Sequence, residues 1–540
     1  MVLFFPDGLD VQRMDALLAE GKLPNIEKHF VRGGVRVQRA INSIPALTYP
    51  NSVSLMTGVF PGHHGIMGNQ LFDRRNMYWV DYITAESYLK VNDDFAVPTL
   101  YERIPDHFTV NVQCPTHRGV THTLDNPVET GIAWFLGWHI EVDQFVASCI
   151  EQIGPAAERA GRWPSVITFY FPGLDEIGHQ NGSGSAAYRA AILNIDYQIG
   201  RVIDALERAG LLDSSHLVLV SDHGQIDARN LQRFDLIDWL RKHRGLRLHY
   251  GDIPRTGYPE RAAFLDSYDL MLVDGSARRY LLHVRGKQGW DESPTEERIT
   301  QIITGQAEAA QSIPNGGAPL YEQPGVGLVA ARAGEDRVRV FARDGQAIIE
   351  RRRAGSTREY RILSERGGED PLGLAETPEL SRFITAGWHG SREWLAATAE
   401  SRHPDFVPQI VEYFDAITSG DIVVFCAEGW VFAGAEPGEH GSCLHEDMRI
   451  PIFFAGPGLP RGASIPHGRL VDVMPTVLDL LGESARLQTP PKIDGESLLP
   501  QLRTADAAHG DRVGVTTDDR PDPLRRSSSA IRAGTTSLDD

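Results

Sequence analysis

Short apolar runs alternate with helical patterns along this chain of 540 residues. The runs read VLFF, SVITFYF, HLVLVS, DIVVF and IPIFFAG. Between the second and third runs, apolar residues from Ile192 to Leu206 recur at the spacing of one helix face, which predicts a helix ending at Gly210. Strands that alternate with helices predict an α/β fold with a mostly parallel sheet sandwiched by helices. Such sheets place their functional sites in loops at the carboxyl ends of the strands.

Length, charge and cysteine content limit the possible functions. The chain is long for a single hydrophobic core, so we expect a large catalytic domain with an insertion or a second lobe. The formal charge of -19 argues against binding to nucleic-acid polymers or anionic membranes, because both are polyanions. The cysteines lie far apart without a CxxC pair, which is typical of neither a disulfide framework nor a cysteine metal site. They are Cys114, Cys149, Cys426 and Cys443.

Sequence signals for membranes and export are weak. No apolar run approaches the ~20 residues that a membrane-spanning helix requires. The first residues, MVLFFPDGLD, lack a basic segment, and their apolar run is too short for a signal peptide. We therefore expect a cytoplasmic protein for the sequence as written, and an exported one if the true start lies upstream.

Acidic and histidine side chains follow three of the apolar runs directly. Asp7 follows the first, Asp175 and His179 follow the second, and Asp222 and His223 follow the third. An Asp and a His four residues apart could be a surface pair on a helix, a capping acid beside an unrelated neighbour, or two ligands of one metal ion. Three strand ends that deliver such groups to one edge of a sheet favour a shared site over three separate caps.

Two further segments carry polar side chains that could take part in catalysis or metal binding. Thr48 stands in a proline-punctuated turn before a predicted helix at 51–56, where backbone N–H groups and the helix dipole favour an oxyanion. The alternative is a threonine that only caps the helix. His440 and His445 lie in a glycine-rich loop before another strand. One of these histidines could complete a site, and the other would then be a surface or supporting residue.

In this order the motifs resemble the alkaline phosphatase superfamily and, within it, the type I phosphodiesterase/nucleotide pyrophosphatase family. They are DG after the first strand, TYPN, TGVFPGHHGIMGN, LDEIGHQNG, SDHGQ, EHG followed by DMRIPIFFAGPG, and DVMPTVLDLLG with DGESLLPQL. The resemblance implies an alkaline phosphatase-like catalytic domain made of residues 1–235 and 420–503. Residues 236–419 would form a smaller α+β insert, and the polar tail at 504–540 is expected to be disordered.

The resemblance also implies two divalent metal ions, which we expect to be Zn²⁺. One ion would be held by Asp175, His179 and His440, and the other by Asp7, Asp222, His223 and the Thr48 hydroxyl. Imidazole and carboxylate groups are common zinc ligands. The ions would supply the local positive charge that an acidic protein needs in order to bind a phosphate ester.

The activity implied by the resemblance is hydrolysis of phosphodiester or pyrophosphate bonds in small nucleotide-type or related diesters. Thr48 would be the nucleophile and would form a phosphothreonine intermediate. Asn69 would donate its side-chain amide to a non-bridging oxygen of the substrate. Phe72, together with Tyr49 and Phe60, could form an apolar wall for the second ester group, and core packing is the alternative for each ring.

Other functions stay open at this point. The same metal site could serve a phosphonate or phosphomonoester hydrolase or a phosphoryl transferase, and the fold could belong to a catalytically silent binding protein. A sulfatase is disfavoured, because TYPN differs from the Cys/Ser-x-Pro-x-Arg motif that is typical of the sulfatase branch. No lysine or arginine stands between Ala40 and Asp73, which favours a diester over the more highly charged monoester.

Several polar neighbours of these motifs are expected to be structural. They are His63, His64, His445 and Glu176. Within the insert, RVRVFARDGQAIIERR predicts a hairpin turning at Asp344 and Gly345, and STREYRIL predicts another strand. The segment at 297–311 predicts a helix. The insert would select the group attached to phosphorus or serve as a structural elaboration.

Overall fold

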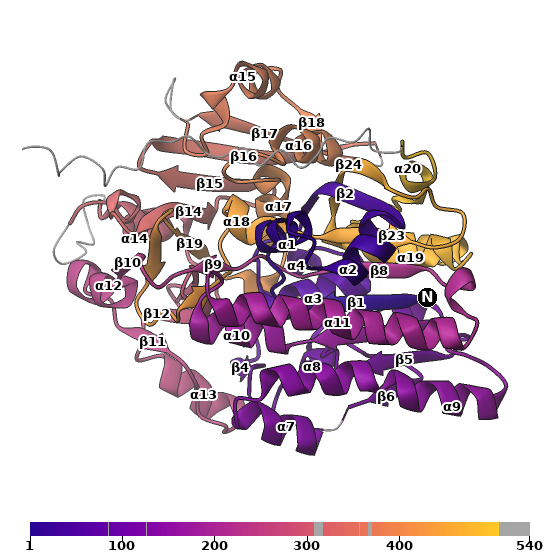
Figure 1. The fold of residues 1–540 in the computed structure, drawn as a ribbon. Helices are drawn as coiled ribbons and strands as arrows, with labels where there is room; N and C mark the ends of the chain where they lie inside the picture. The colour runs from indigo at the N-terminus through magenta and orange to yellow at the C-terminus, as the bar shows by residue number, and fades with distance from the viewer. Residues whose placement is uncertain (85, 126, 307–316, 356, 365–369, 507–540) are drawn as a thin grey trace, which may run out of the picture. The chain divides into compact units, whose positions relative to one another are not determined.

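The first apolar run forms a buried strand, β1 (Val2–Pro6), in the middle of a nine-stranded sheet (Figure 1). The computed structural model describes residues 1–506 apart from 85, 126, 307–316, 356 and 365–369. Beyond its first three residues, the tail predicted to be disordered lies outside the described residues.

The sheet that contains β1 is mostly parallel, as predicted. Its order is β22 (Arg449–Ile450), β2 (Gly34–Ile41), β23 (Ile452–Ala455), β8 (Leu217–Val220), β1, β7 (Val166–Phe171), β5 (Thr109–Val112) and β6 (His122–Leu124), with β24 (Ala463–Arg469) beside β2. Among the described residues, five of its strand pairs are parallel and three, around β2 and β23, are antiparallel. The α/β class is therefore confirmed.

Helices cover both faces of this sheet (Figure 1). One face packs against α1 (Val11–Ala19), α8 (His139–Ser148), α9 (Ile150–Ala160) and α11 (Ala186–Arg208). The other packs against α3 (Thr48–Thr57), α6 (Leu100–Arg103) and α19 (Val473–Leu480). The predicted apolar face of α11 is buried, and Gly210 follows the helix with a φ of 69°. Burial of apolar stripes on both faces gives the sheet its two hydrophobic layers.

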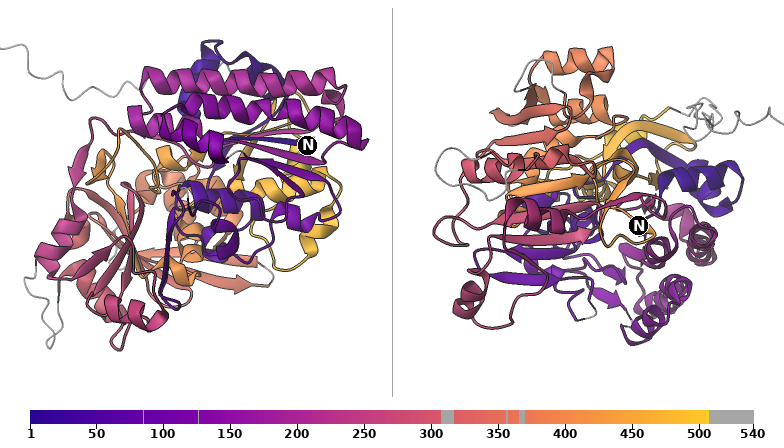
Figure 2. Two further views of the ribbon diagram at one scale, coloured as in Figure 1. Left: turned by 90° about the horizontal axis from the view of Figure 1, so that it is seen from below. Right: turned by 90° about the vertical axis from the view of Figure 1, so that its left-hand side faces the viewer.

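A second nine-stranded sheet is built mostly from residues of the predicted insert. Its order is β11 (Leu248–Tyr250), β12 (Leu270–Ser276), β13 (Arg279–Val284), β19 (Ile422–Cys426), β14 (Val326–Arg332), β15 (Arg337–Ala342), β16 (Gly345–Ala354), β17 (Thr357–Ser364) and β18 (His389–Gly390). Figure 2 shows these strands as a layer apart from α8, α9 and α11. The run DIVVF, which follows the predicted insert, lies here as β19. The boundaries at 235 and 420 stay a prediction.

Local predictions for the insert agree with the structure in kind. β15 and β16 form the expected hairpin, but Ala342 pairs with Gly345, so Arg343 and Asp344 make the turn. β17 is the predicted additional strand. The first part of the helix predicted at 297–311 is α14 (Glu296–Thr304), which is capped by Gly305 with a φ of 72°. Residues 307–311 of that prediction lie outside the described residues.

Two expectations from composition concern the cysteines and the apolar character of the helices. The four cysteines are buried free thiols, in line with the expectation that they form no disulfide framework. No helix in the described ranges combines the length and the apolar character needed to cross a membrane.

Candidate metal centre

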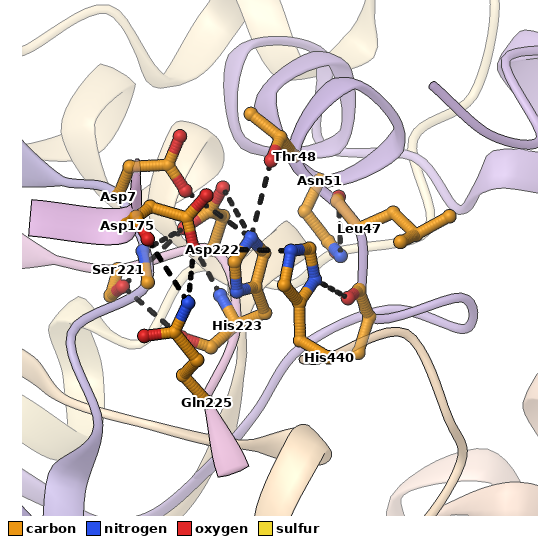
Figure 3. A network of polar contacts seen from close by, with 12 residues as sticks. Asp7, Leu47, Thr48, Asn51, Asp175, Ser221, Asp222, His223, Gln225 and His440 are labelled. Carbon is orange, nitrogen blue, oxygen red and sulfur yellow. Dashed lines mark hydrogen bonds and ion pairs between the residues drawn. The ribbon is translucent and has the colours of Figure 1, made fainter. Parts of the chain in front are cut away.

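Three adjacent parallel strands bring the predicted acidic and histidine residues together. Asp7 follows β1, Asp222 and His223 follow β8, and α10 (Gly173–Asn181) after β7 carries Asp175 and His179. Because β8, β1 and β7 are neighbours that run in the same direction, their carboxyl ends open onto one edge of the sheet. Figure 3 shows Asp7, Asp175, Asp222 and His223 converging there.

One cluster surrounds the Nε2 atom of His223. This nitrogen lies 3.2 Å from Asp7 Oδ1, 3.5 Å from Asp222 Oδ2 and 3.2 Å from the Thr48 hydroxyl oxygen (Figure 3). The Asp7 Oδ1 and Asp222 Oδ2 atoms are buried without a hydrogen-bond partner. Burial, and then the neighbouring Asp7 carboxylate, raise the pKa of Asp222 well above its usual value. A cation among these atoms would compensate the two carboxylates.

A second cluster adjoins the first. The Nε2 atoms of His179 and His440 lie 3.1 Å apart, and His179 Nε2 lies 3.3 Å from Asp175 Oδ2. The imidazole of His440 also stacks on that of His223, with ring centroids 3.6 Å apart and planes 8° apart. The predicted ligands, Thr48 included, come from five separate segments of the chain and therefore form one continuous polar centre.

Backbone carbonyls determine which nitrogen each histidine presents. The Nδ1–H groups of His179, His223 and His440 donate to the carbonyls of Gly438, Gly224 and Ala46, at 2.8, 3.0 and 2.8 Å. In the neutral imidazole, each Nε2 atom then keeps its lone pair for the interior of the centre. Facing lone pairs 3.1 Å apart in His179 and His440 repel unless a proton or a metal ion lies between them. The donor set therefore fits divalent metal ions.

Thr48 and Asn69 lie beside the clusters. Thr48 is the first residue of α3, which begins three residues earlier than the predicted 51–56 helix because Pro50 is tolerated in the first turn. Its hydroxyl therefore lies at the helix N-terminus. The Asn69 Oδ1 atom accepts the N–H of Tyr49 at 3.2 Å, which turns the amide nitrogen of Asn69 away from that backbone.

Two supporting residues were missed in the sequence. The Tyr170 hydroxyl donates to Asp7 Oδ2, which leaves Oδ1 for the cluster. The Gln225 amide donates to Asp175 Oδ1 at 3.0 Å and to the Asp175 carbonyl at 3.1 Å. Both residues stand inside the motifs FYF and SDHGQ, but only the packed structure shows which way their side chains point.

The histidines expected to be structural have other partners. His64 Nε2 lies 3.1 Å from Ser54 Oγ, and His445 Nε2 lies 3.5 Å from a Glu400 carboxylate oxygen. His63, Glu412 and Asp415 lie close enough to hold a metal ion. Their carboxylates already form ion pairs with Arg351, and with Arg358 in the case of Glu412, which compensates their charge.

Phe72 lies in the hydrophobic core, whereas Glu176 lies on α10 outside both clusters. Phe72, predicted as a substrate contact, is 0% exposed and packs edge-on against His283 and Trp290. This placement supports the core-packing alternative for Phe72. Glu176 accepts a hydrogen bond from Gln180 at 2.9 Å on the outer side of α10.

Together these features define an α/β protein with a candidate metal centre of two adjoining clusters at the carboxyl edge of its sheet. The chain belongs to the type I phosphodiesterase/nucleotide pyrophosphatase family, whose model matches residues 1–289. The resemblance seen in the motifs is thereby confirmed.

Known relatives agree with this membership. The chain is 26% identical over 301 residues to ectonucleotide pyrophosphatase/phosphodiesterase family member 1 of Rattus norvegicus, covering 53% of this chain and 30% of that protein. It is 26% identical over 228 residues to a bis(5'-adenosyl)-triphosphatase of Mus musculus, covering 40% and 45%. The chain thus spans less than half the length of these relatives. The structure of murine ectonucleotide pyrophosphatase/phosphodiesterase 5 matches the fold with a TM-score of 0.51 at 16% identity, covering 94% of this chain and 100% of that chain.

Proposed function

We propose that the protein hydrolyses phosphodiester or pyrophosphate bonds of small nucleotide-type substrates with Thr48 as nucleophile. One observation carries the proposal: the Thr48 hydroxyl lies at a helix N-terminus, 3.2 Å from the Nε2 atom of His223 in the buried centre. Membership of the family supports it. One relative is named as a bis(5'-adenosyl)-triphosphatase. An inactive threonine-to-alanine variant of murine ectonucleotide pyrophosphatase/phosphodiesterase 5 was solved in complex with AMP.

Two zinc ions would be held by the two clusters. The proposed ligands are Asp175, His179 and His440 for one, and Asp7, Asp222, His223 and Thr48 for the other. Bound there, zinc would lower the pKa of a coordinated hydroxyl or water and offset charge on the phosphoryl oxygens. Three carboxylates carry less charge than two divalent cations, so the loaded centre would attract a phosphate group despite the acidic chain.

The residues of the chain then act in order. The Thr48 oxygen forms a bond to phosphorus while the bond from phosphorus to the leaving oxygen breaks, and the proton of the Thr48 hydroxyl passes through solvent to the leaving oxygen. The Asn69 amide donates to a non-bridging oxygen, on which negative charge grows. The N-terminal N–H groups of α3 favour the same anion. Water then cleaves the phosphothreonine and restores the Thr48 hydroxyl.

Thr48→Ala tests the nucleophile. It removes the attacking oxygen and one ligand of a four-ligand set, so we expect both zinc ions to remain while turnover collapses. Thr48→Ser should retain partial activity because it keeps the hydroxyl. Rapid quench of wild-type protein with a labelled diester should trap phosphothreonine.

Thr57→Ala is the matched control, because Thr57 is a buried threonine at the other end of α3 whose hydroxyl donates to Val53. Its turnover should stay close to wild type. Wild-type activity in Thr48→Ala would refute covalent catalysis at this residue. A substrate panel of dinucleotides, nucleotide diesters, lipid-headgroup diesters, monoesters and phosphonates would decide between the diesterase and its alternatives.

A further inference from the structure

A buried arginine from the second sheet reaches the loop that carries His440. Arg278 lies in the turn between β12 and β13 and is 0% exposed. Its guanidinium binds both carboxylate oxygens of Asp447, with Nη2 2.6 Å from Oδ2 and Nε 3.3 Å from Oδ1. It also donates to Glu446 at 3.1 Å and to the carbonyl of Trp430 at 3.2 Å. Every one of these bonds uses the planar fork of arginine.

Asp447 is hydrogen-bonded to the two loops that carry the candidate ligands His440 and His223. Its Oδ1 atom accepts the N–H of Ser442, two residues after His440, at 3.3 Å. Its backbone carbonyl accepts the N–H of Gly224, the residue after His223, at 3.0 Å. The Asn42 amide donates to that same carbonyl at 3.1 Å and to the Asp222 carbonyl at 2.9 Å. Asp447 is therefore bonded to the loops of both clusters.

The same turn contacts residues on both sides of His440. The Ala277 N–H donates to the carboxylate of Glu439 at 3.3 Å. A Cβ atom at Gly441 would lie 2.3 Å from the Ser276 hydroxyl oxygen, so the turn packs directly against Gly441. The residues before and after His440 are thus held by one turn of the second sheet.

We infer that Arg278 is a positioning residue for His440, and that the second sheet thereby completes the metal centre. The inference rests on the proposed metal site. Without the guanidinium fork, the buried Asp447 carboxylate loses the bidentate partner that compensates its charge and fixes its orientation toward Ser442. The His440 loop then loses the bond that holds Ser442, although none of its own residues has changed.

Arg278→Lys tests this role, because lysine keeps the charge but lacks the fork. Asp447→Asn is the second variant, since it keeps the size of the side chain and removes its charge. Arg469→Lys is the matched control: Arg469 forms a similarly buried pair with Asp405, at 2.6 and 2.7 Å. Zinc affinity is measured by chelator competition and folding by thermal unfolding of the zinc-free protein.

We expect all three variants to lower Tm, but only Arg278→Lys and Asp447→Asn to weaken zinc binding, by about 10- to 100-fold as for other residues that orient metal ligands. Equal zinc affinity in Arg278→Lys and Arg469→Lys would overturn the inference and leave the proposed function standing. If Arg278→Lys does not fold, wild-type zinc affinity in Asp447→Asn would overturn it equally. Wild-type protein that binds no zinc would overturn both proposals.

Discussion

Gly8 directly follows Asp7 in the candidate metal centre, and a single added methyl group there should disturb the proposed metal ligands. Its φ is 62°, in the left-handed region, and its N–H donates to Asp222 Oδ1 at 3.1 Å. A Cβ atom at this position would lie 2.5 Å from Asp175 Oδ1 and 3.1 Å from Asp175 Cβ. In Gly8→Ala the Asp175 side chain must therefore move.

The structure separates two contributions to the cost. An alanine in the left-handed region costs about 1–2 kcal/mol of folding free energy. Overpacking against Asp175 adds about 1–3 kcal/mol. Gly21 isolates the first contribution, because its φ is 68° and a Cβ atom there would meet nothing within 4 Å. Gly8→Ala should thus lower the free energy of unfolding by more than Gly21→Ala does.

Chemical denaturation of both variants with a chelator present gives these free energies without a contribution from bound metal. Chelator competition then gives zinc affinity, which should fall about 10- to 100-fold in Gly8→Ala and remain at the wild-type value in Gly21→Ala. Equal destabilisation of the two variants, together with wild-type zinc affinity in Gly8→Ala, would refute the packing argument.

Four further predictions concern catalysis, substrate preference, pH and metal content. Asn69→Ala should lower diester turnover by ~10²–10³ with unchanged zinc content. In steady-state assays of the wild type, kcat/KM for an aryl diester should exceed that for the matching monoester at least about tenfold. Burial, opposed by a hydrogen bond from the Gly173 N–H, raises the pKa of Asp143 to about 8. Folding stability is therefore lost as pH rises from about 4 towards 8. Asp143→Asn should raise Tm at about pH 8 and leave it unchanged near about pH 4. His64→Ala should retain wild-type zinc content by elemental analysis, because its ring bonds Ser54 instead.

Much of the candidate site could be predicted because its signals are local. An aspartate or histidine that directly follows an apolar run lies at a strand end, and parallel strands share one edge. Asp7, Asp175 and Asp222 were found in this way. His440 needed the resemblance to the family, because its own loop offered His445 as an equal candidate. The expected roles of these residues stay a prediction, although their convergence is observed.

The sequence by itself determined the α/β class, the order of the segments that carry the candidate ligands, and the hairpin of β15 and β16, because strand and turn preferences act over a few residues. Only the tertiary structure decided that β19 joins the second sheet, that Phe72 is buried, and that Arg278 reaches Asp447 across 169 positions of the chain. Such pairings depend on which surfaces bury the most apolar area while keeping every buried charge compensated. No short stretch of residues contains that information, so the second sheet's contact with the His440 loop could be found only in the folded chain.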